Sequence, residues 1–444
     1  MDEGSLLGDC LKQLDWSPDK LAREINRVRP NSISPKAPYG WLKGSTPRGD
    51  LPQIVASVLS HHLKETITVA ALWPAKATLV GSDGWLRQPW SQEGTWAGLG
   101  SFTAGPLRSG LGVLRPLSGQ GLIGAAVEWL TTEDEPVIGR PSGETISLQV
   151  IDVLVDRVAQ LRRIDDVQGG PLVLDWITQD LNWAAHLARN GSYDPAIGQC
   201  LHSVLAELAQ LAGWLACDLG RNALGQRYLL FGLRAAHTAN NRALGANIVS
   251  CLSYQAAWGD THDEALRLIK IARQGIGGTP GGAVHALLAT RQARAHAQLG
   301  QLDDCARAID EAAAALAESA ADDTTPAWAY WVTPAVLAAD AGRAWLELGR
   351  PEVAERHLLH GLHLFGDEQP RNRLLHTMSL AKARLRQRDL DGAADATHQA
   401  LDLRSYLESG RARQRMTGLR DEFKQSDSPL AHDVTEQISA VLAA

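Results

Sequence analysis

The sequence predicts an all-α protein in which a small N-terminal bundle of helices precedes a long array of helical hairpins. Apolar residues recur at helical spacing over residues 5–75 and again from about residue 147 to the C-terminus. Alternation of apolar and polar residues, which is typical of half-buried strands, does not occur in the C-terminal part. In that part, small residues recur at intervals near 40 positions, which predicts a repeated structural unit.

The N-terminal helices are predicted from their start signals and apolar stripes. Ser17 and Pro18 provide an N-cap followed by a proline at the first helical position, and Pro52 opens a later helix. Thr68 is expected to cap a last short helix that ends at Trp73-Pro74. The expected buried positions are Leu7, Leu11 and Leu14 in the first helix, Leu21, Ile25 and Val28 in the second, and Ile54, Val55, Val58, Leu59 and Leu63 in the third.

Residues 76–147 have a different composition from the helical segments on either side. Eleven glycines fall between Gly81 and Gly124, and four tryptophans occur without a helical period. This composition predicts a Gly/Trp-rich connector with patches that dock elsewhere. The expected domains are therefore residues 1–75, the connector 76–147, and the helical array 148–444.

The repeat in the array is read from five anchors at helix-to-helix turns, which are Gly220, Asp260, Gly300, Gly349 and Arg388. A small residue stands seven positions before, five after and twelve after each anchor. Small side chains at fixed places let paired helices and neighbouring pairs approach closely, as a solenoid requires. The fifteen positions are Gly213, Ser253, Ala293, Gly342 and Ala381, then Gly225, Ala265, Cys305, Ala354 and Ala393, and then Gly232, Ala272, Ala312, Gly361 and Ala400.

The pattern LGxxxxA, followed seven positions later by another small residue, resembles the tetratricopeptide repeat with elongated helices or turns. Segments 148–165 and about 172–190 are expected to form a diverged helix pair before the first clear repeat, and residues 429–442 a capping helix. The predicted fold is thus a helix-turn-helix-like bundle followed by a tetratricopeptide-repeat superhelix.

The combination resembles actinobacterial transcriptional regulators that join a helix-turn-helix to tetratricopeptide repeats, in particular negative regulators of development and antibiotic production. Three stretches carry the resemblance: residues 35–44 (PKAPYGWLKG) with Pro47-Arg48 after them, residues 163–170 (RIDDVQGG), and residues 211–220 (LAGWLACDLG). The resemblance implies a cytoplasmic DNA-binding regulator, with repression as the function of that subgroup, and not an enzyme. A palindromic operator would favour a homodimer.

The N-terminal bundle carries a local basic patch although the whole chain is acidic. The net charge is −7, but the segment from Lys20 to Arg48 has seven basic residues against the single acid Glu24. In a helix-turn-helix, residues 18–28 would form the first helix and residues 37–43 the recognition helix, with Trp41 and Leu42 packed inward. The expected DNA-contacting residues are Arg23, Arg27, Lys36, Tyr39, Lys43 and Arg48.

Pro35 and Pro38 limit the recognition helix to one or two turns, which leaves a second interpretation open. The module would then be a solvated basic surface on a protein-binding scaffold that no longer reads DNA. A third class, an ancillary domain of an enzyme, is disfavoured by the absence of any reactive constellation.

The inner surface of the array is the expected site for a peptide, small-molecule or protein partner. Six positions before each anchor, the first helix of each repeat should point a side chain into the groove. Amides and cations there could bind a peptide backbone or a carboxylate. The expected residues are Trp214, Tyr254, Arg294, Arg343 and Lys382, with Asn247, Arg291 and Gln298 on nearby helical rows.

No catalytic residue, metal site or cofactor is predicted. The five cysteines show no CxxC spacing, and His357, His360 and His363 fan around a helix without a carboxylate at ligand spacing. Gly119 to Gly124 match GxGxxG but follow no credible strand. Asp165 and Asp166 are interpreted as part of a helix end rather than a carboxylate pair. No secretory leader or long uncharged apolar run is found, so a cytoplasmic location is expected.

Overall fold

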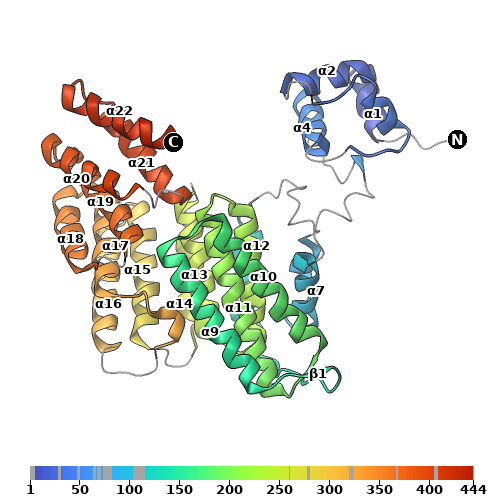
Figure 1. Cartoon of the computed structure of the whole chain (residues 1–444), viewed down its shortest axis with the longest axis horizontal. Helices are drawn as coiled ribbons and strands as arrows, with labels where there is room; N and C mark the ends of the chain where they lie inside the picture. Colours follow the sequence, from blue (N-terminus) through green and yellow to red (C-terminus); the bar gives the residue numbers. More distant parts are fainter. Residues whose placement is uncertain are drawn as a thin grey trace. The chain divides into compact units, whose positions relative to one another are not determined.

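The computed structural model describes residues 6–28, 32–47, 51–63, 67, 72–73, 83–103, 116–259, 261–277, 281–319, 325–366, 369–404 and 409–443. These residues fold into helices joined by turns, with a single pair of two-residue strands, so the predicted all-α fold is confirmed (Figure 1). The chain divides into two compact units. The first comprises residues 1–89 and 96–115, and the second residues 90–95 and 116–444.

The first unit contains a small helical bundle whose apolar stripes meet in one core. Leu7, Leu21, Ile25 and Leu59 are almost fully buried there, and Trp41 packs edge-on against Trp73. Val28 is 65% exposed, so the prediction that it lies on the buried face is wrong. Thr68 and Pro74 lie outside the described residues. The described elements are α1 (Leu6–Gln13), α2 (Pro18–Val28), α3 (Ala37–Leu42), α4 (Leu51–Leu63) and the 3-10 helix η1 (Asp83–Arg87).

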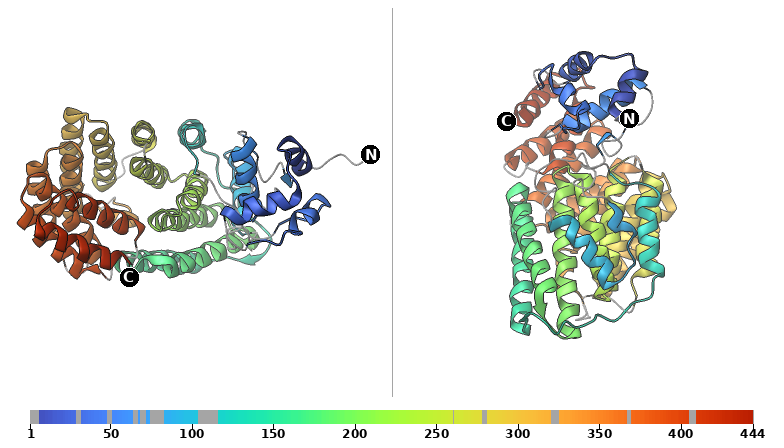
Figure 2. Two further views of the ribbon diagram at one scale, coloured as in Figure 1. Left: turned by 90° about the horizontal axis from the view of Figure 1, so that it is seen from above. Right: turned by 90° about the vertical axis from the view of Figure 1, so that its right-hand side faces the viewer.

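The second unit is a curved array of antiparallel helix pairs, and its last helices return beside its first (Figure 2). The pairs are α9 (Leu148–Val167) with α10 (Gly170–Asn190), α11 (Pro195–Asp218) with α12 (Asn222–Thr238), α13 (Arg242–Trp258) with α14 (His262–Gly275), α15 (Gly282–Gln298) with α16 (Leu302–Ser319), α17 (Pro334–Glu347) with α18 (Pro351–Leu364), α19 (Pro370–Arg386) with α20 (Leu390–Asp402), and α21 (Gly410–Phe423) with α22 (Pro429–Ala443). The 3-10 helix η2 (Ala327–Ala329) lies between α16 and α17.

All fifteen predicted small residues are buried between helices. A Cβ added at Gly213 would lie 2.7 Å from Leu229 Cγ, and one added at Gly342 would lie 2.7 Å from Leu358 Cγ. At the equivalent place in the next pair, Ser253 donates its hydroxyl to the Ala265 carbonyl at 2.8 Å. The same register therefore produces the same close helix contact in successive hairpins.

The predicted anchors adopt the backbone conformation that lets a helix end and reverse. Gly220, Gly300 and Gly349 have φ between 69° and 76°, and Arg388 has φ of 65°. Asp260 lies outside the described residues. The helix that follows Arg388 begins at a side-chain cap, because the Asp389 carboxylate accepts the Gly392 N–H at 2.9 Å.

The predicted connector is partly structured. Helix α7 (Gln92–Thr103) begins in it, and α8 (Gln120–Thr131) packs against α12 and α14. The glycines at 245 and 275 make room for Trp129 of α8, and Gln226 accepts the Leu117 N–H at 2.7 Å. The second unit thus extends beyond the predicted array boundary at residue 148, because α8 buries its apolar face on the array.

Two further features complete the second unit. Strand β1 (Glu144–Thr145) pairs in parallel with β2 (Gly191–Ser192). Helix α11 is long and apolar enough to cross a membrane by composition, but 72% of the window is buried by neighbouring helices, as in a core helix. By itself it is weak support for a membrane span.

Candidate functional site

The eight predicted groove residues lie on the first helices of successive hairpins and line two neighbouring cavities. The central cavity, of about 450 Å³, is bordered by Trp214, Asn247, Tyr254, Arg291 and Arg343. A second cavity, of about 290 Å³, is bordered by Arg294, Gln298, Arg343 and Lys382 and is called the cationic cavity below. Arg343 is common to both walls. All eight residues therefore line a cavity of the array, and their role in binding a partner stays a prediction.

Aromatic rings and arginines alternate along this inner surface. The ring centres of Trp214 and Tyr254 are 5.3 Å apart, and those of Tyr254 and Trp258 are 6.2 Å apart. Arg291 lies 4.2 Å from the Tyr254 ring centre, and Arg294 lies 5.0 Å from both Tyr254 and Trp258. Guanidinium groups stack on aromatic faces in this way with favourable electrostatics.

Helix α21 adds two more arginines to the same rings. Arg411 lies 4.3 Å from the Trp214 ring centre and Arg415 lies 5.2 Å from that of Trp258. Residues 410–423 lie in the part of the chain predicted to be helical, although α21 was not predicted as a separate helix. The sequence does contain a pattern that indicates this helix: Ser409 can act as its N-cap, and apolar residues follow at helical spacing. These apolar residues, Ala412, Met416, Leu419 and Phe423, are all buried in the structure.

The clustered arginines create a positive potential inside the array. Burial alone would raise the pKa of Tyr254, but Arg294, Arg411, Arg415 and Arg291 stabilise its phenolate and lower that pKa to about 8. Burial lowers the pKa of Arg415 to about 10, and Arg294 and Arg411 add to the effect despite the opposing attraction of Tyr254. The interior therefore favours negative charge.

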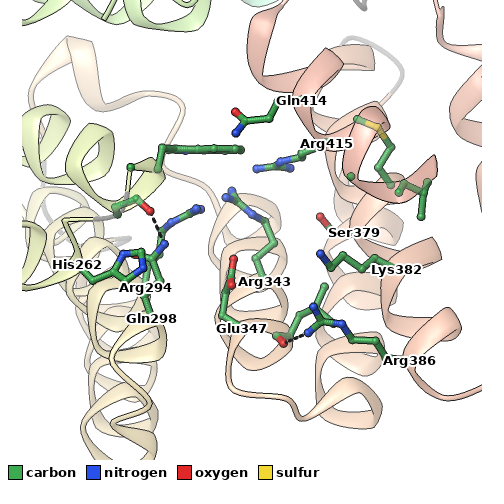
Figure 3. Close-up of a pocket in the computed structure, with 17 residues that line it drawn as sticks. His262, Arg294, Gln298, Arg343, Glu347, Ser379, Lys382, Arg386, Gln414 and Arg415 are labelled. Carbon is green, nitrogen blue, oxygen red and sulfur yellow. Dashed lines mark hydrogen bonds between the residues drawn. The ribbon is translucent and has the colours of Figure 1, made fainter. Parts of the chain in front are cut away.

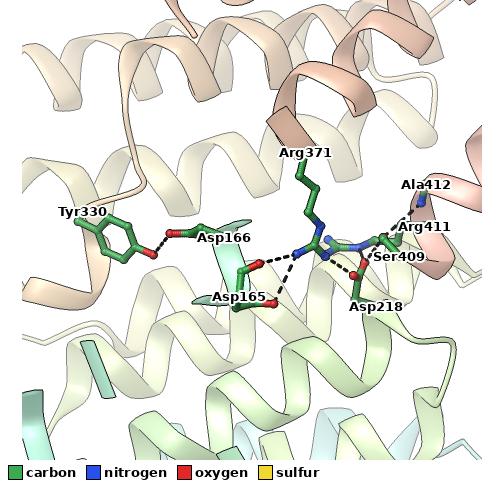
Figure 4. A network of polar contacts seen from close by, with 8 residues as sticks. All are labelled: Asp165, Asp166, Asp218, Tyr330, Arg371, Ser409, Arg411 and Ala412. Carbon is green, nitrogen blue, oxygen red and sulfur yellow. Dashed lines mark hydrogen bonds and ion pairs between the residues drawn. The ribbon is translucent and has the colours of Figure 1, made fainter. Parts of the chain in front are cut away.

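A separate ion-pair network joins the two ends of the array (Figure 4). Asp218, at the end of α11, accepts hydrogen bonds from Arg371 of α19, from Arg411 of α21, and from the Ser409 hydroxyl at 2.7 Å. The two guanidinium groups outweigh the burial of Asp218 and hold its pKa below the usual value. We call these residues, with Asp165, the closure network.

Asp165 and Asp166 contribute to the contact between the ends of the array. Arg371 donates to the Asp165 carbonyl at 3.1 Å and to its carboxylate at 3.4 Å, while Tyr330 donates its hydroxyl to Asp166. The two side chains do point to different partners, as expected for adjacent helix residues. Helix α9 ends at Val167, so the interpretation of the two residues as part of a helix end is confirmed. In addition, Asp165 is a buried ion-pair partner of Arg371, which the sequence did not predict.

The predicted DNA-contacting residues lie on or beside α2 and α3, which pack against each other. Arg23, Arg27, Lys36, Tyr39 and Lys43 are exposed. Arg48 lies outside the described residues. Trp41 is buried and Leu42 half-buried, as the helix-turn-helix interpretation requires.

Two of these residues are engaged within the bundle. The Tyr39 hydroxyl donates to Asp19 Oδ2 at 2.6 Å, and this hydrogen bond raises the pKa of Tyr39. Arg27 pairs with Glu24 at 2.7 Å on the same helix. The cationic groups of the α2–α3 surface that form no ion pair within the described chain are therefore Arg23, Lys36, Lys43 and Lys20, of which Lys20 lies over the Trp16 ring.

Part of the first unit matches a known protein family. Residues 7–72 match the family model described as the SP15 N-terminal domain. Curated proteins gave no match to the chain. The matched segment contains α1 to α4 and well under half of the sequence.

Proposed function

We propose that the protein is a cytoplasmic transcriptional regulator, with the N-terminal bundle as its DNA-binding part and the helical array as its ligand-binding part. Repression of development or secondary metabolism is the role suggested by the sequence resemblance. The observation that carries the proposal is the exposure of Arg23, Lys36 and Lys43 on the paired helices α2 and α3 of an otherwise acidic chain. Such a patch supplies the phosphate contacts that DNA binding needs.

The array supports the second half of this proposal. Its inner surface presents arginines, aromatic rings and amides to two cavities, whereas a purely structural solenoid would need only its packed helix faces. A ligand that binds one curvature of the array more tightly than another would shift the population of array conformations. That shift would be the input to the regulator.

DNA binding is tested with the full chain in two steps. Genome-wide chromatin immunoprecipitation of the tagged protein should give discrete peaks, and DNA from those peaks then serves in quantitative gel-shift titrations. The variant R23Q/K36Q/K43Q should bind this DNA at least about tenfold more weakly. It should also reduce the slope of log affinity against log salt by about one for each phosphate group that the variant no longer neutralises.

The matched control is K12Q, which neutralises a lysine that is 79% exposed on α1, outside the α2–α3 surface. It should bind like the wild type. Equal binding by the triple variant and K12Q would contradict the proposed surface.

One observation favours a second candidate function, a protein-binding scaffold. Helix α3 has only six residues, and Tyr39 on it is tied to Asp19, which leaves few groups to read base edges. An absence of discrete genomic peaks, together with a stable protein partner that co-purifies with the array, would select the scaffold.

A further inference from the structure

The cationic cavity is formed by four helices, α15, α17, α19 and α21, together with the end of α13 and the start of α14. Figure 3 shows Arg294 of α15, Arg343 of α17 and Arg415 of α21 with their guanidinium groups pointing toward one another into the same space. Lys382 and Arg386 of α19 lie on the wall beside them, and Glu347 at the end of α17 is the acidic residue among the lining residues. Groups that come from separate helices and converge on one space are the usual construction of a ligand site.

Most of these cations have carboxylate partners, but two do not. Asp340 pairs with Arg343 at 3.0 Å and with Arg291 at 3.6 Å. Glu422 pairs with Lys382 at 2.6 Å and lies 3.7 Å from Arg386. Among the residues that the structure describes, no carboxylate pairs with Arg294 or Arg415.

The stacking of these two arginines leaves their hydrogen-bond donors available. A guanidinium that stacks on an aromatic ring uses its flat face, whereas its N–H groups point outward in the plane. Arg415 gives one N–H to the Leu375 carbonyl at 3.0 Å, and the buried Nε of Arg294 has no hydrogen-bond partner among the described residues. A buried donor without an acceptor costs stability, so the retention of the unpaired Arg294 Nε points to a bound acceptor.

The missing acceptor is best matched by a group that carries two negative charges and several oxygen atoms. Two unpaired arginines require about two charges, and three converging guanidinium groups require more oxygens than one planar carboxylate offers. A tetrahedral phosphate group meets both needs and forms charge-assisted forked hydrogen bonds with arginine. The cavity volume of about 290 Å³ fits a small molecule rather than a folded partner.

We propose that the cationic cavity binds a small phosphate-bearing molecule, with its phosphate group held by Arg294, Arg343 and Arg415. This inference rests on the proposed ligand-binding role of the array and specifies the ligand's chemistry. The aromatic rings of Tyr254 and Trp258 hold Arg294 and Arg415 in place. The negative charge of the phosphate offsets the repulsion among the guanidinium groups.

The test is a calorimetric titration of the full-length protein with inorganic pyrophosphate, with acetate at matched ionic strength as the comparison anion. Wild-type protein should bind pyrophosphate and show a higher melting temperature with it, because a ligand that binds only the folded state stabilises that state. The variant R294Q/R415Q should bind at least about tenfold more weakly. The control R307Q, which changes an arginine that is 66% exposed on α16, should bind like the wild type.

A second readout uses the wild-type protein alone and so does not depend on variant folding. Pyrophosphate should raise the pKa of Tyr254 from about 8, because the phosphate neutralises the arginines that favour its phenolate. Ultraviolet difference titration follows this ionisation, and the variant Y254F identifies which of the six tyrosines is responsible.

Three outcomes would overturn the inference: no binding of pyrophosphate, equal stabilisation by pyrophosphate and acetate, or equal binding by R294Q/R415Q and R307Q. Each concerns the array only. Loss of anion binding with intact DNA binding would leave the regulator proposal standing, and failure of DNA binding would leave the anion titration interpretable.

Discussion

The packed faces between the helices of the array and its inner surface follow opposite rules. Between helices, small residues recur at fixed positions, and even one added methyl group at Gly213 or Gly342 would collide with a leucine. On the inner surface, arginines and aromatic rings occur without a common repeat, and Arg294 and Arg415 lack carboxylate partners in the described chain. The packed faces are thus arranged for stability. The inner surface instead retains buried arginines without carboxylate partners, which lower the stability of the fold, as is typical of binding sites.

The largest effect is expected where a buried charge holds the two ends of the array together. Asp218→Ala leaves Arg371 and Arg411 without their shared carboxylate, and removing one partner of a buried ion pair costs about 3–5 kcal/mol. Urea unfolding measures this change in stability. The control Asp421→Ala breaks an exposed pair and should change stability by less than about 1 kcal/mol. Similar values for the two variants would show that the closure network does not stabilise the array.

Acid should destabilise the protein through two buried histidines. Burial lowers the pKa of His202 to about 4 and that of His376 to about 3, below the unfolded value of about 6.5. The unfolded state therefore binds more protons below pH 6.5, and stability falls as the pH drops from 6.5 toward 4, by on the order of 3 kcal/mol for each histidine.

The histidine prediction is measured by urea unfolding at a series of pH values. His376 stacks on Phe365 with ring centres 5.5 Å apart, so His376→Phe keeps an aromatic ring and should flatten the pH dependence. The exposed His432 provides the control His432→Gln. An unchanged pH profile in His376→Phe would contradict the assignment.

The next largest loss of stability is expected when a close contact between two helices is overpacked. Gly342→Val should destabilise by about 1–3 kcal/mol, because its side chain would meet Leu358 and the Ala354 carbonyl. Gly418→Ala in α21 is the matched control, since its added Cβ has nothing within 4 Å and should stabilise the helix by about 0.5–1 kcal/mol. If Gly342→Val were tolerated as well as Gly418→Ala, the small-residue register would not control packing.

The smallest effect should have the opposite sign and lies on the inner surface. Arg415→Gln removes a buried charge that is repelled by Arg294 and Arg411, and we expect the ligand-free protein to gain up to about 1 kcal/mol. Thermal unfolding without added anions measures this gain. A destabilisation of several kcal/mol would mean that Arg415 is a packing residue and not part of a binding site.

The regular features of the fold could be predicted from the sequence because they depend on local periodicity. The fifteen small positions, the left-handed turns at Gly220, Gly300 and Gly349, and the inward-facing side chains of the repeat helices all follow from one register. The same register predicts that Arg294 and Arg343 lie on the inner surface, but it does not predict that Arg415 of α21 lines the same cavity.

The remaining features depend on contacts between residues that are far apart in the sequence. Closure of the array brings Asp218 to Arg371 and Arg411, and no local pattern encodes the curvature that produces this contact. The sequence of helix α8 has apolar residues at helical spacing, but the glycine-rich segment around it led to the prediction of a connector. Val28 continues the apolar spacing of α2, but it is the last residue of that helix and its side chain lies outside the core.

A crystal structure of the full chain grown with pyrophosphate would test most directly whether the inner surface is a binding site. The account predicts the anion in the cationic cavity, within hydrogen-bond distance of the guanidinium groups of Arg294, Arg343 and Arg415. A structure at saturating pyrophosphate with that cavity free of the anion, and with anions bound only at exposed arginines such as Arg307, would contradict it.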